Sequence, residues 1–189
     1  MTIRPPEHVA LENDTYLRWV TVDDAEAIAQ AVGESLDQLR PWMPWADAQS
    51  ADATFQRVRL RDHPQQRRRG AEWQYGLFRT ADDALLGSIG FMTRRGPGTL
   101  EIGYWLRVDA GHRGYATTAA QALTETGLQM EGIDRTIIVC DEANVRSAAI
   151  PKRLGYALDH VEARAPEAPG ETGVMQFWIA ERAGPPTTP

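Results

Sequence analysis

The stretch Glu101-Ile-Gly-Tyr-Trp-Leu-Arg-Val-Asp-Ala-Gly-His-Arg-Gly-Tyr-Ala-Thr117 decides the fold of this chain. It predicts a buried strand over 100–108, a turn marked by glycines, and a helix over 115–130. At such a junction, several backbone N–H groups and the positive end of a helix dipole point at one place. The stretch therefore predicts a phosphate-binding site.

A second block, Asn144-Val-Arg-Ser147, continues into Lys152-Arg-Leu-Gly-Tyr156. Together the two blocks resemble the acyl-CoA-binding core of the GNAT superfamily of N-acetyltransferases. The earlier run Leu39-Arg-Pro-Trp-Met-Pro-Trp45 is similar to the RimJ/RimL branch of that superfamily. The resemblance covers roughly residues 16–180 and implies an enzyme that uses acetyl-CoA.

The elements predicted around these blocks give an α+β protein with a mixed sheet. We expect strands over 16–20, 73–79, 85–93, 100–108, 136–140, 156–164 and 174–180. We expect helices over 25–32, 34–39, 50–62, 115–130 and 143–154, with Ser50 as the cap of the third helix. The resemblance implies the GNAT fold, a mostly antiparallel sheet that is splayed between its fourth and fifth strands and flanked by helices.

Length and composition favour one globular domain over residues 1–182. The chain has 189 residues, of which 42% are hydrophobic and 24% charged, and its proline-rich end, 183–189, is expected to be a disordered tail. A net charge of −6 argues against nucleic acid as a partner. The sequence shows no membrane segment, and Cys140 is its one cysteine, so we expect a cytoplasmic protein with a buried, inert thiol.

The resemblance implies that residues 111–116 hold the pyrophosphate of CoA through backbone N–H groups. Small residues suit this place because the backbone must approach the phosphate closely. The chain departs from the family signature, since Gly111 replaces a Gln or Arg and His112 replaces a frequent glycine. The expected cofactor-binding residues of this loop are Gly111, His112, Arg113, Gly114, Tyr115 and Ala116.

The pantetheine arm is expected along the splayed strand. By resemblance, backbone groups between Tyr104 and Val108, including those of Leu106, bind its amides, and a main-chain N–H near Leu106 meets the oxyanion. Asn144 matches a family residue that contacts the pantetheine. An asparagine at the start of a helix is also a good N-cap, and both roles are compatible.

Two residues are the candidates for acid–base chemistry. Glu101 stands where many family members place a general base that acts through water, and the alternative is a surface glutamate at a strand edge. Ser147 resembles the serine of the RimJ/RimL branch that assists the departing thiolate, and the alternative is a small residue packed under CoA. Pro151 occupies the position at which many GNAT enzymes carry a tyrosine.

Trp42 and Trp45, bracketed by prolines, are expected to form a rigid wall of the acceptor site or to staple a helix to the core. The acceptor is expected to be a primary amine, either a peptide N-terminus or the amino group of a small molecule such as an antibiotic. We expect direct transfer of the acetyl group in a ternary complex. We expect no metal, because the histidines lack the spacing of metal ligands. Pairing of exposed strand edges into a homodimer is open.

Two other functions are compatible with the sequence. One is transfer of a different acyl group, such as succinyl, which the basic stretch between Arg57 and Arg69 permits if that stretch attracts an anionic ligand. The simpler interpretation of that stretch is the solvated face of a helix. The other function is a non-catalytic acyl-CoA-binding module, supported by the changes at Gly111 and Pro151.

Overall fold

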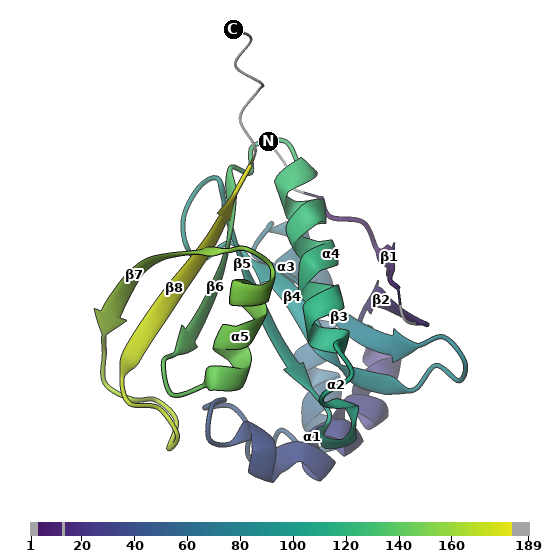
Figure 1. Cartoon of the computed structure of the whole chain (residues 1–189). Helices are drawn as coiled ribbons and strands as arrows, with labels where there is room; N and C mark the ends of the chain where they lie inside the picture. Colours follow the sequence, from purple (N-terminus) through teal and green to yellow (C-terminus); the bar gives the residue numbers. More distant parts are fainter. Residues whose placement is uncertain (1–3, 13, 183–189) are drawn as a thin grey trace, which may run out of the picture.

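A computed structural model describes residues 4–12 and 14–182 of the chain and contains one eight-stranded sheet in the order β1-β2-β3-β4-β5-β6-β8-β7 (Figure 1). The strands are β1 (His8–Ala10), β2 (Thr15–Trp19), β3 (Glu72–Arg79), β4 (Leu85–Met92), β5 (Thr99–Leu106), β6 (Arg135–Asp141), β7 (Ala157–Ala163) and β8 (Val174–Glu181). Only β5 and β6 are parallel neighbours among these described strands. The predicted α+β class with a mixed, mostly antiparallel sheet is confirmed.

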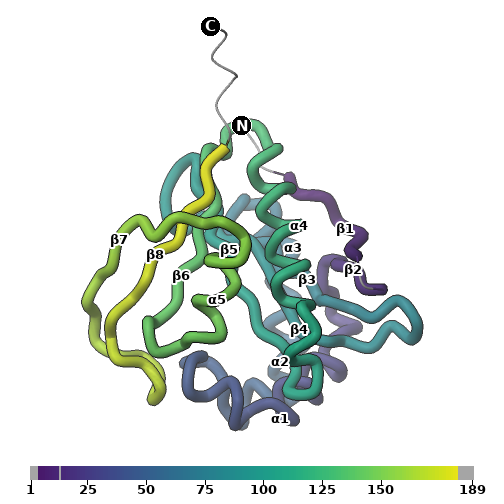
Figure 2. The backbone as a smooth tube through the Cα atoms, viewed as in Figure 1, coloured from purple at the N-terminus to yellow at the C-terminus, as the bar shows by residue number. Residues whose placement is uncertain are grey.

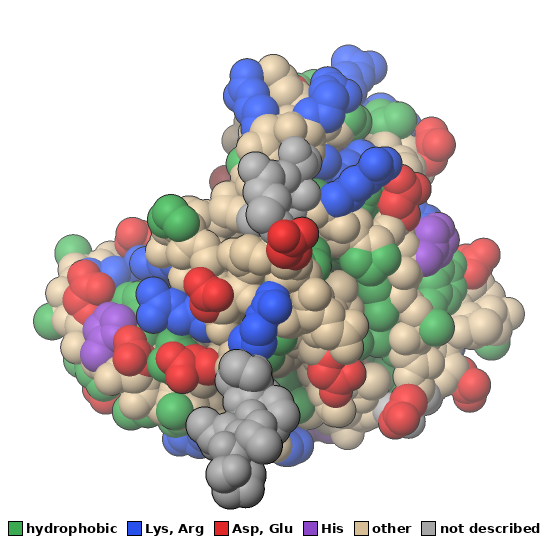
Figure 3. Space-filling view, turned by 90° about the horizontal axis from the view of Figure 1, so that it is seen from above, with side chains coloured by type: hydrophobic (Ala, Val, Ile, Leu, Met, Phe, Trp, Pro, Cys, Tyr) green, Lys and Arg blue, Asp and Glu red, His purple; other side chains and the backbone are tan. Residues whose placement is uncertain are grey.

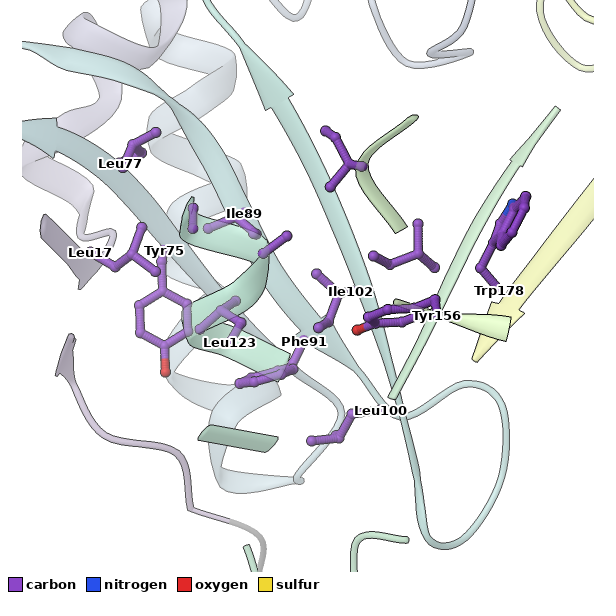
Figure 4. Packing of buried hydrophobic residues seen from close by; sticks show 14 of the residues in the cluster. Leu17, Tyr75, Leu77, Ile89, Phe91, Leu100, Ile102, Leu123, Tyr156 and Trp178 are labelled. Atoms are coloured by element: carbon purple, nitrogen blue, oxygen red, sulfur yellow. The ribbon is translucent and has the colours of Figure 1, made fainter. Parts of the chain in front are cut away.

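Helices cover both faces of the sheet (Figure 1). They are α1 (Ala25–Leu39), α2 (Ala53–Arg61), α3 (His63–Arg68), α4 (Tyr115–Gln129) and α5 (Val145–Arg153). Helix α4 packs on one face through Ala119, Ala120 and Leu123, which belong to the main apolar cluster (Figure 4). Helices α1 and α2 lie on the opposite face, where Ile28 and Leu60 share a second cluster with Trp105.

The parallel pair β5–β6 separates into a V along its length. Thr99–Glu101 pair with Arg135–Ile137, and beyond these residues the two strands lose contact (Figure 2). The predicted splay between the fourth and fifth strands is therefore confirmed. These strands are labelled β5 and β6 because the structure adds β1, which the sequence did not predict.

Helix α1 is continuous, although the sequence predicted two helices separated near Gly33. Glycine in a helix interior costs about 1 kcal/mol relative to alanine. The buried face of α1 includes Ile28, Val32, Ser35 and Leu39, so it continues on both sides of Gly33. Burial of that face outweighs the local cost of glycine.

The start of α2 was also predicted wrongly. Asp52 caps this helix, because its carboxylate accepts a hydrogen bond from the Phe55 N–H at 2.8 Å. Ser50 instead closes a turn with Asp47, whose N–H donates to the Ser50 hydroxyl at 2.9 Å. Pro64 stands in the first turn of α3, where a missing N–H costs nothing.

The described residues end at position 182, so the tail expected over 183–189 lies outside them. The single domain expected over 1–182 stays a prediction. No helix within the described ranges, 4–12 and 14–182, has the length and apolar character needed to cross a membrane.

Candidate functional site

A cavity of about 960 Å³ begins in the V between β5 and β6 and extends across the sheet beneath α1 and α2. In the V it is lined by Tyr104, Cys140 and Ser147, and beneath the helices by Gln74 and Ser88. Side chains alternate between the faces of a strand, so the α4 face of the same strands carries the packed core. The cavity is large enough for two substrates to meet.

Two adjacent glycines form the hollow floor of the cavity. Gly90 of β4 pairs with Gly103 of β5, and Gln74 of β3 pairs with Gly90 on the other side. A Cβ on Gly103 would lie 2.9 Å from the Met92 Cε atom, and a Cβ on Gly90 would lie 2.6 Å from the Trp73 carbonyl oxygen. Glycine is therefore required at Gly90 by close approach of backbone, and at Gly103 it keeps the floor open.

The loop between β5 and α4 has the geometry of an anion cradle. His112 and Gly114 both have positive φ, at 62° and 79°, and α4 begins directly afterwards at Tyr115. Positive φ is a region that favours glycine, although histidine adopts it more readily than most residues. The first N–H groups of α4 have no acceptor within the helix, so they can bind an anion.

Arg153 of α5 reaches this cradle, which the sequence did not indicate. Its Nη1 atom donates to the Thr117 hydroxyl oxygen at 2.9 Å, beside the first turn of α4. Together with the exposed Arg113, it can supply a second positive charge near a bound phosphate. Only the packing of α5 against α4 brings Arg153 and Thr117 together.

The backbone of β5 offers hydrogen-bonding groups to the V. Arg107 N–H donates to the Leu86 carbonyl at 2.8 Å, so the alternate residues Tyr104 and Leu106 turn their backbone groups toward β6. Two of the groups near the end of the strand are already used by α1. Gln38 Nε2 donates to the Leu106 carbonyl at 3.3 Å, and Val108 N–H donates to the Ser35 hydroxyl at 3.0 Å. The groups left for a ligand are the Leu106 N–H and those of Tyr104.

Asn144 caps α5. Its side-chain oxygen accepts the Ser147 N–H at 3.1 Å, which is the capping role named as the alternative for this residue. Pro151 lies inside the same helix and has no N–H for the Ser147 carbonyl. The Tyr104 hydroxyl takes that place: it donates to the Ser147 carbonyl at 3.1 Å and lies 3.2 Å from the Ser147 hydroxyl oxygen. Because Pro151 leaves the Ser147 carbonyl unpaired within the helix, the hydrogen bond from Tyr104 can join α5 to the wall of the V.

Tyr104 is a candidate residue that the sequence analysis missed as a side chain. Burial raises the pKa of its hydroxyl far above the usual value, so the group stays protonated and can donate. Burial also raises the pKa of the neighbouring Cys140 thiol to about 11, which leaves it protonated near pH 7. The V therefore contains neutral donors beside Ser147 and no thiolate.

Glu101 is buried in the cavity with 4% of its surface exposed, rather than at a solvated strand edge. Arg94 Nε and Arg95 Nε donate to its Oε2 atom at 2.9 and 2.6 Å, and Arg94 Nη2 contacts Oε1. Burial alone would raise its pKa, but hydrogen bonds and charge from the two arginines hold the pKa below its ordinary value. Glu101 is thus an ionised carboxylate whose two oxygens are already engaged.

The loop after α1 forms the outer wall of the cavity. It carries Trp42 and Trp45, which both line the cavity, and the Trp45 ring centre lies 6.1 Å from that of Trp105. The loop is joined to the connection between β7 and β8, because Gly170 N–H donates to the Pro41 carbonyl at 2.8 Å. Trp45 stays 43% exposed, so it lies at the rim.

Asp141 fastens the same connection to the end of β6. Its carboxylate accepts N–H groups from Thr172 and Gly173 at 3.0 and 2.9 Å. Burial opposes ionisation, but these and other donors hold its pKa below the ordinary value. Within the described residues, no group of three or more His, Cys, Asp or Glu could hold a metal ion.

Similar proteins place this geometry in a family. Residues 14–157 match the family described as "Acetyltransferase (GNAT) domain". YnaD of Bacillus subtilis, named as an uncharacterised N-acetyltransferase, is 35% identical over 74 residues, which span 39% of this chain and 44% of YnaD. The same organism's YdaF, whose name proposes a ribosomal N-acetyltransferase, is 25% identical over 82% of this chain and 81% of its own length.

Solved structures share the fold at low identity. RimL, described as a ribosomal L7/L12 alpha-N-protein acetyltransferase in complex with coenzyme A, has a TM-score of 0.83 and 20% identity over 93% of this chain and 98% of its own. Mycobacterium smegmatis RimJ in complex with CoA-disulfide has a TM-score of 0.85 and 19% identity over 96% of this chain and 90% of its own. The matched domain, the splayed sheet and these folds agree, and the chain belongs to the GNAT family of N-acetyltransferases.

Proposed function

We propose that the chain transfers an acetyl group from acetyl-CoA to a primary amine, with both substrates bound at once. One continuous cavity carries this proposal, because it joins the V to the hollow beneath α1 and α2. The acyl donor would enter the V, and the acceptor would lie over Gly90 and Gly103. The reacting atoms would then meet beside Gly103 without a covalent enzyme intermediate.

The donor would be held by three groups of residues. The cradle formed by Gly111, His112, Arg113, Gly114, Tyr115 and Ala116 would bind the pyrophosphate. The backbone of Tyr104 and the Leu106 N–H would bind the pantetheine arm, with the Leu106 N–H also near the developing oxyanion. Val108 would support the site indirectly, since its N–H is held by Ser35. Asn144 would act by fixing the start of α5 and thereby Ser147.

In the reaction, the neutral amine nitrogen attacks the thioester carbonyl, the C–S bond breaks, and the nitrogen loses one proton while the sulfur gains one. Ser147 would donate a hydrogen bond to the departing sulfur, and Tyr104 would hold the Ser147 carbonyl. We propose that Glu101 accepts the acceptor's proton through water. The two arginines lower its proton affinity, so the proton would pass on to solvent.

The acceptor would be a peptide N-terminus or the amino group of a small molecule, and Trp42 and Trp45 would form the wall beside it. The names of RimL and of the microcin C7 self-immunity acetyltransferase MccE support these two classes. The acidic net charge of −6 favours approach of a cationic amine.

The test is release of free CoA thiol with acetyl-CoA or succinyl-CoA and a panel of amines and N-terminal peptides. We expect turnover with acetyl-CoA and at least one acceptor class, and loss of that turnover in a Gly114→Val variant, which cannot form the cradle. Tight CoA binding without thiol release above background on the whole panel would contradict the proposal. Faster release with succinyl-CoA would instead identify a different acyl donor.

A further inference from the structure

Arg59 is exceptional among the arginines that line the cavity. Arg94 and Arg95 form ion pairs with Glu101, and Arg164 forms ion pairs with Glu167 and Glu171. Arg59 pairs with no carboxylate of the described residues and is held by two glutamines instead. Its positive charge is therefore directed into the cavity with no carboxylate of the described residues at ion-pair distance.

The two glutamines are themselves fixed by further hydrogen bonds. Arg59 Nε donates to Gln56 Oε1 at 3.0 Å, and Arg59 Nη1 donates to Gln74 Oε1 at 2.9 Å. The amide nitrogen of Gln56 donates to the Ser50 carbonyl, and that of Gln74 donates to the Ser88 hydroxyl at 2.9 Å. Since both amide nitrogens are used elsewhere, both oxygens must face Arg59. The guanidinium is held rigidly by neutral partners that do not cancel its charge.

A cation that is partly removed from water is costly unless an anion accompanies it. Burial lowers the pKa of Arg59, and Glu72 attracts it from beyond ion-pair distance. The Nη2 group of Arg59 has no partner among the described residues and is free to complete a two-pronged contact. The arrangement is that of a preorganised anion-binding subsite.

Four other arginines of the basic stretch do not share this position. Arg57 forms an ion pair with Glu26 outside the cavity, and Arg61, Arg68 and Arg69 are exposed. Several basic side chains gather at the upper edge of the view in Figure 3, as is ordinary for a solvated surface. Of the alternatives named for the stretch, the solvated face describes these residues, and attraction of an anion remains for Arg59.

We propose that Arg59 is a specificity-determining residue that binds an anionic group of the acceptor, either a carboxylate or a phosphate. This inference rests on the proposed function. The anion belongs to the acceptor because Gln74 lies on β3, two strands away from β5 and thus roughly 10 Å from the V. The acceptor is then an amine with its negative group on the side away from CoA.

The experiment uses acceptors in matched pairs. Peptides with one common N-terminal residue carry Asp or Asn, or Glu or Gln, at the next two positions, and small amines carry a carboxylate, a phosphate or neither. We expect kcat/KM to be about 10- to 100-fold higher for the anionic member of the preferred pair, the range of a charge-assisted contact. Comparison of carboxylate with phosphate identifies which group the subsite takes.

Three variants test the residue itself. Arg59→Gln should bring both members of a pair to the same kcat/KM without changing the KM for acetyl-CoA. Gln74→Glu keeps Arg59 but supplies an internal carboxylate, so it should lower kcat/KM for anionic acceptors only. Arg61→Gln makes the same charge change on the exposed side of α2 and should keep the preference.

Three outcomes would overturn the inference: no preference for the anionic member in the wild-type protein, an unchanged preference in Arg59→Gln, or a preference for succinyl-CoA that Arg59→Gln abolishes. If no acceptor is turned over, the proposed function fails, and binding decides the subsite separately. Glutarate and inorganic phosphate should then raise the melting temperature of the CoA-bound wild-type protein but not of Arg59→Gln. Equal shifts in both proteins would reject the subsite.

Discussion

Strands β3, β4 and β5 present two faces that are built from alternate residues of the same segments. Toward α4 they carry Tyr75, Phe91 and Ile102, each no more than 1% exposed and packed together (Figure 4). Toward α1 and α2, in the part that lines the cavity, they carry polar residues such as Gln74 and Ser88 and the glycine pair Gly90 and Gly103. The period of two in a strand thus lets one sheet provide stability on one face and open space for substrates on the other.

Neighbouring residues of β4 give the strongest test of this division. Phe91→Ala should lower the free energy of unfolding by about 3–5 kcal/mol, because it leaves a void in the packed face. Met92→Ala, on the cavity face, should cost about 1 kcal/mol or less, since Met92 is only partly buried. Urea unfolding measures both. Equal losses would mean that the two faces do not differ in this way.

Filling the floor of the cavity should lower activity strongly and change stability little. Gly103→Val adds a β-branched side chain that suits a strand and displaces only the flexible end of Met92, so stability should change by about 1 kcal/mol or less. Turnover of the acceptor should fall about 100-fold, because the reacting groups lose their alignment. Steady-state kinetics and urea unfolding of the same sample separate these effects. Undiminished turnover would place the acceptor elsewhere.

The V between β5 and β6 is a third region to test, because it is a gap in the sheet rather than part of either face. Ser147→Ala should lower kcat roughly 10- to 100-fold without changing the KM for acetyl-CoA, if the hydroxyl assists the departing sulfur. Tyr104→Phe removes the donor to the Ser147 carbonyl and should have a smaller effect on kcat, with about 1 kcal/mol lost from stability. A kcat for Ser147→Ala equal to that of the wild-type protein would leave Ser147 as a packing residue.

The pH dependence of stability tests the ion pairs of Glu101 with Arg94 and Arg95 on the cavity face. Its lowered pKa means that its contribution to stability is complete above the ordinary glutamate pKa of about 4.3 and is lost as the pH falls below that value. Glu101→Gln should therefore cost roughly 2 kcal/mol at pH 7, less than a fully buried pair because Arg94 is 61% exposed. The deficit should shrink between about pH 5 and pH 3. A deficit that is constant over that range would contradict the ion-pair explanation.

The same variant reports on the proposed base. If Glu101 carries the acceptor's proton through water, Glu101→Gln should lower turnover more than it lowers CoA affinity, which calorimetry measures independently. Unchanged turnover at pH 7 would confine Glu101 to holding Arg94 and Arg95 in place.

The sequence predicted the central strands and α4 because their patterns are local, whereas the V followed from the resemblance to the GNAT fold. The apolar stretches around β4 and β5 and the glycine turn before α4 are visible within a few residues. The cap of α2 was misassigned to Ser50 because Asp52 and Ser50 are both good caps, and only the packed turn with Asp47 separates them.

The side chains that complete the site depend on contacts between distant segments. Tyr104 becomes important because Pro151, far along the chain, leaves a carbonyl unpaired in α5. Arg59 could not be distinguished from its neighbours, since only the placement of α2 over Gln74 turns it into the cavity. Residue types and spacing show the chemistry available, but not which copy of a repeated residue faces the substrate.

The hydrogen bond between Gly170 and Pro41 has a mechanical consequence. The two arms of the sheet are joined at one end by the pairing of Thr99–Glu101 with Arg135–Ile137, and at the other end by this contact between loops. A slot that is closed at both ends keeps its width unless the strands bend. The slot is therefore shaped during folding, and a ligand that enters it does not bear that cost in entropy.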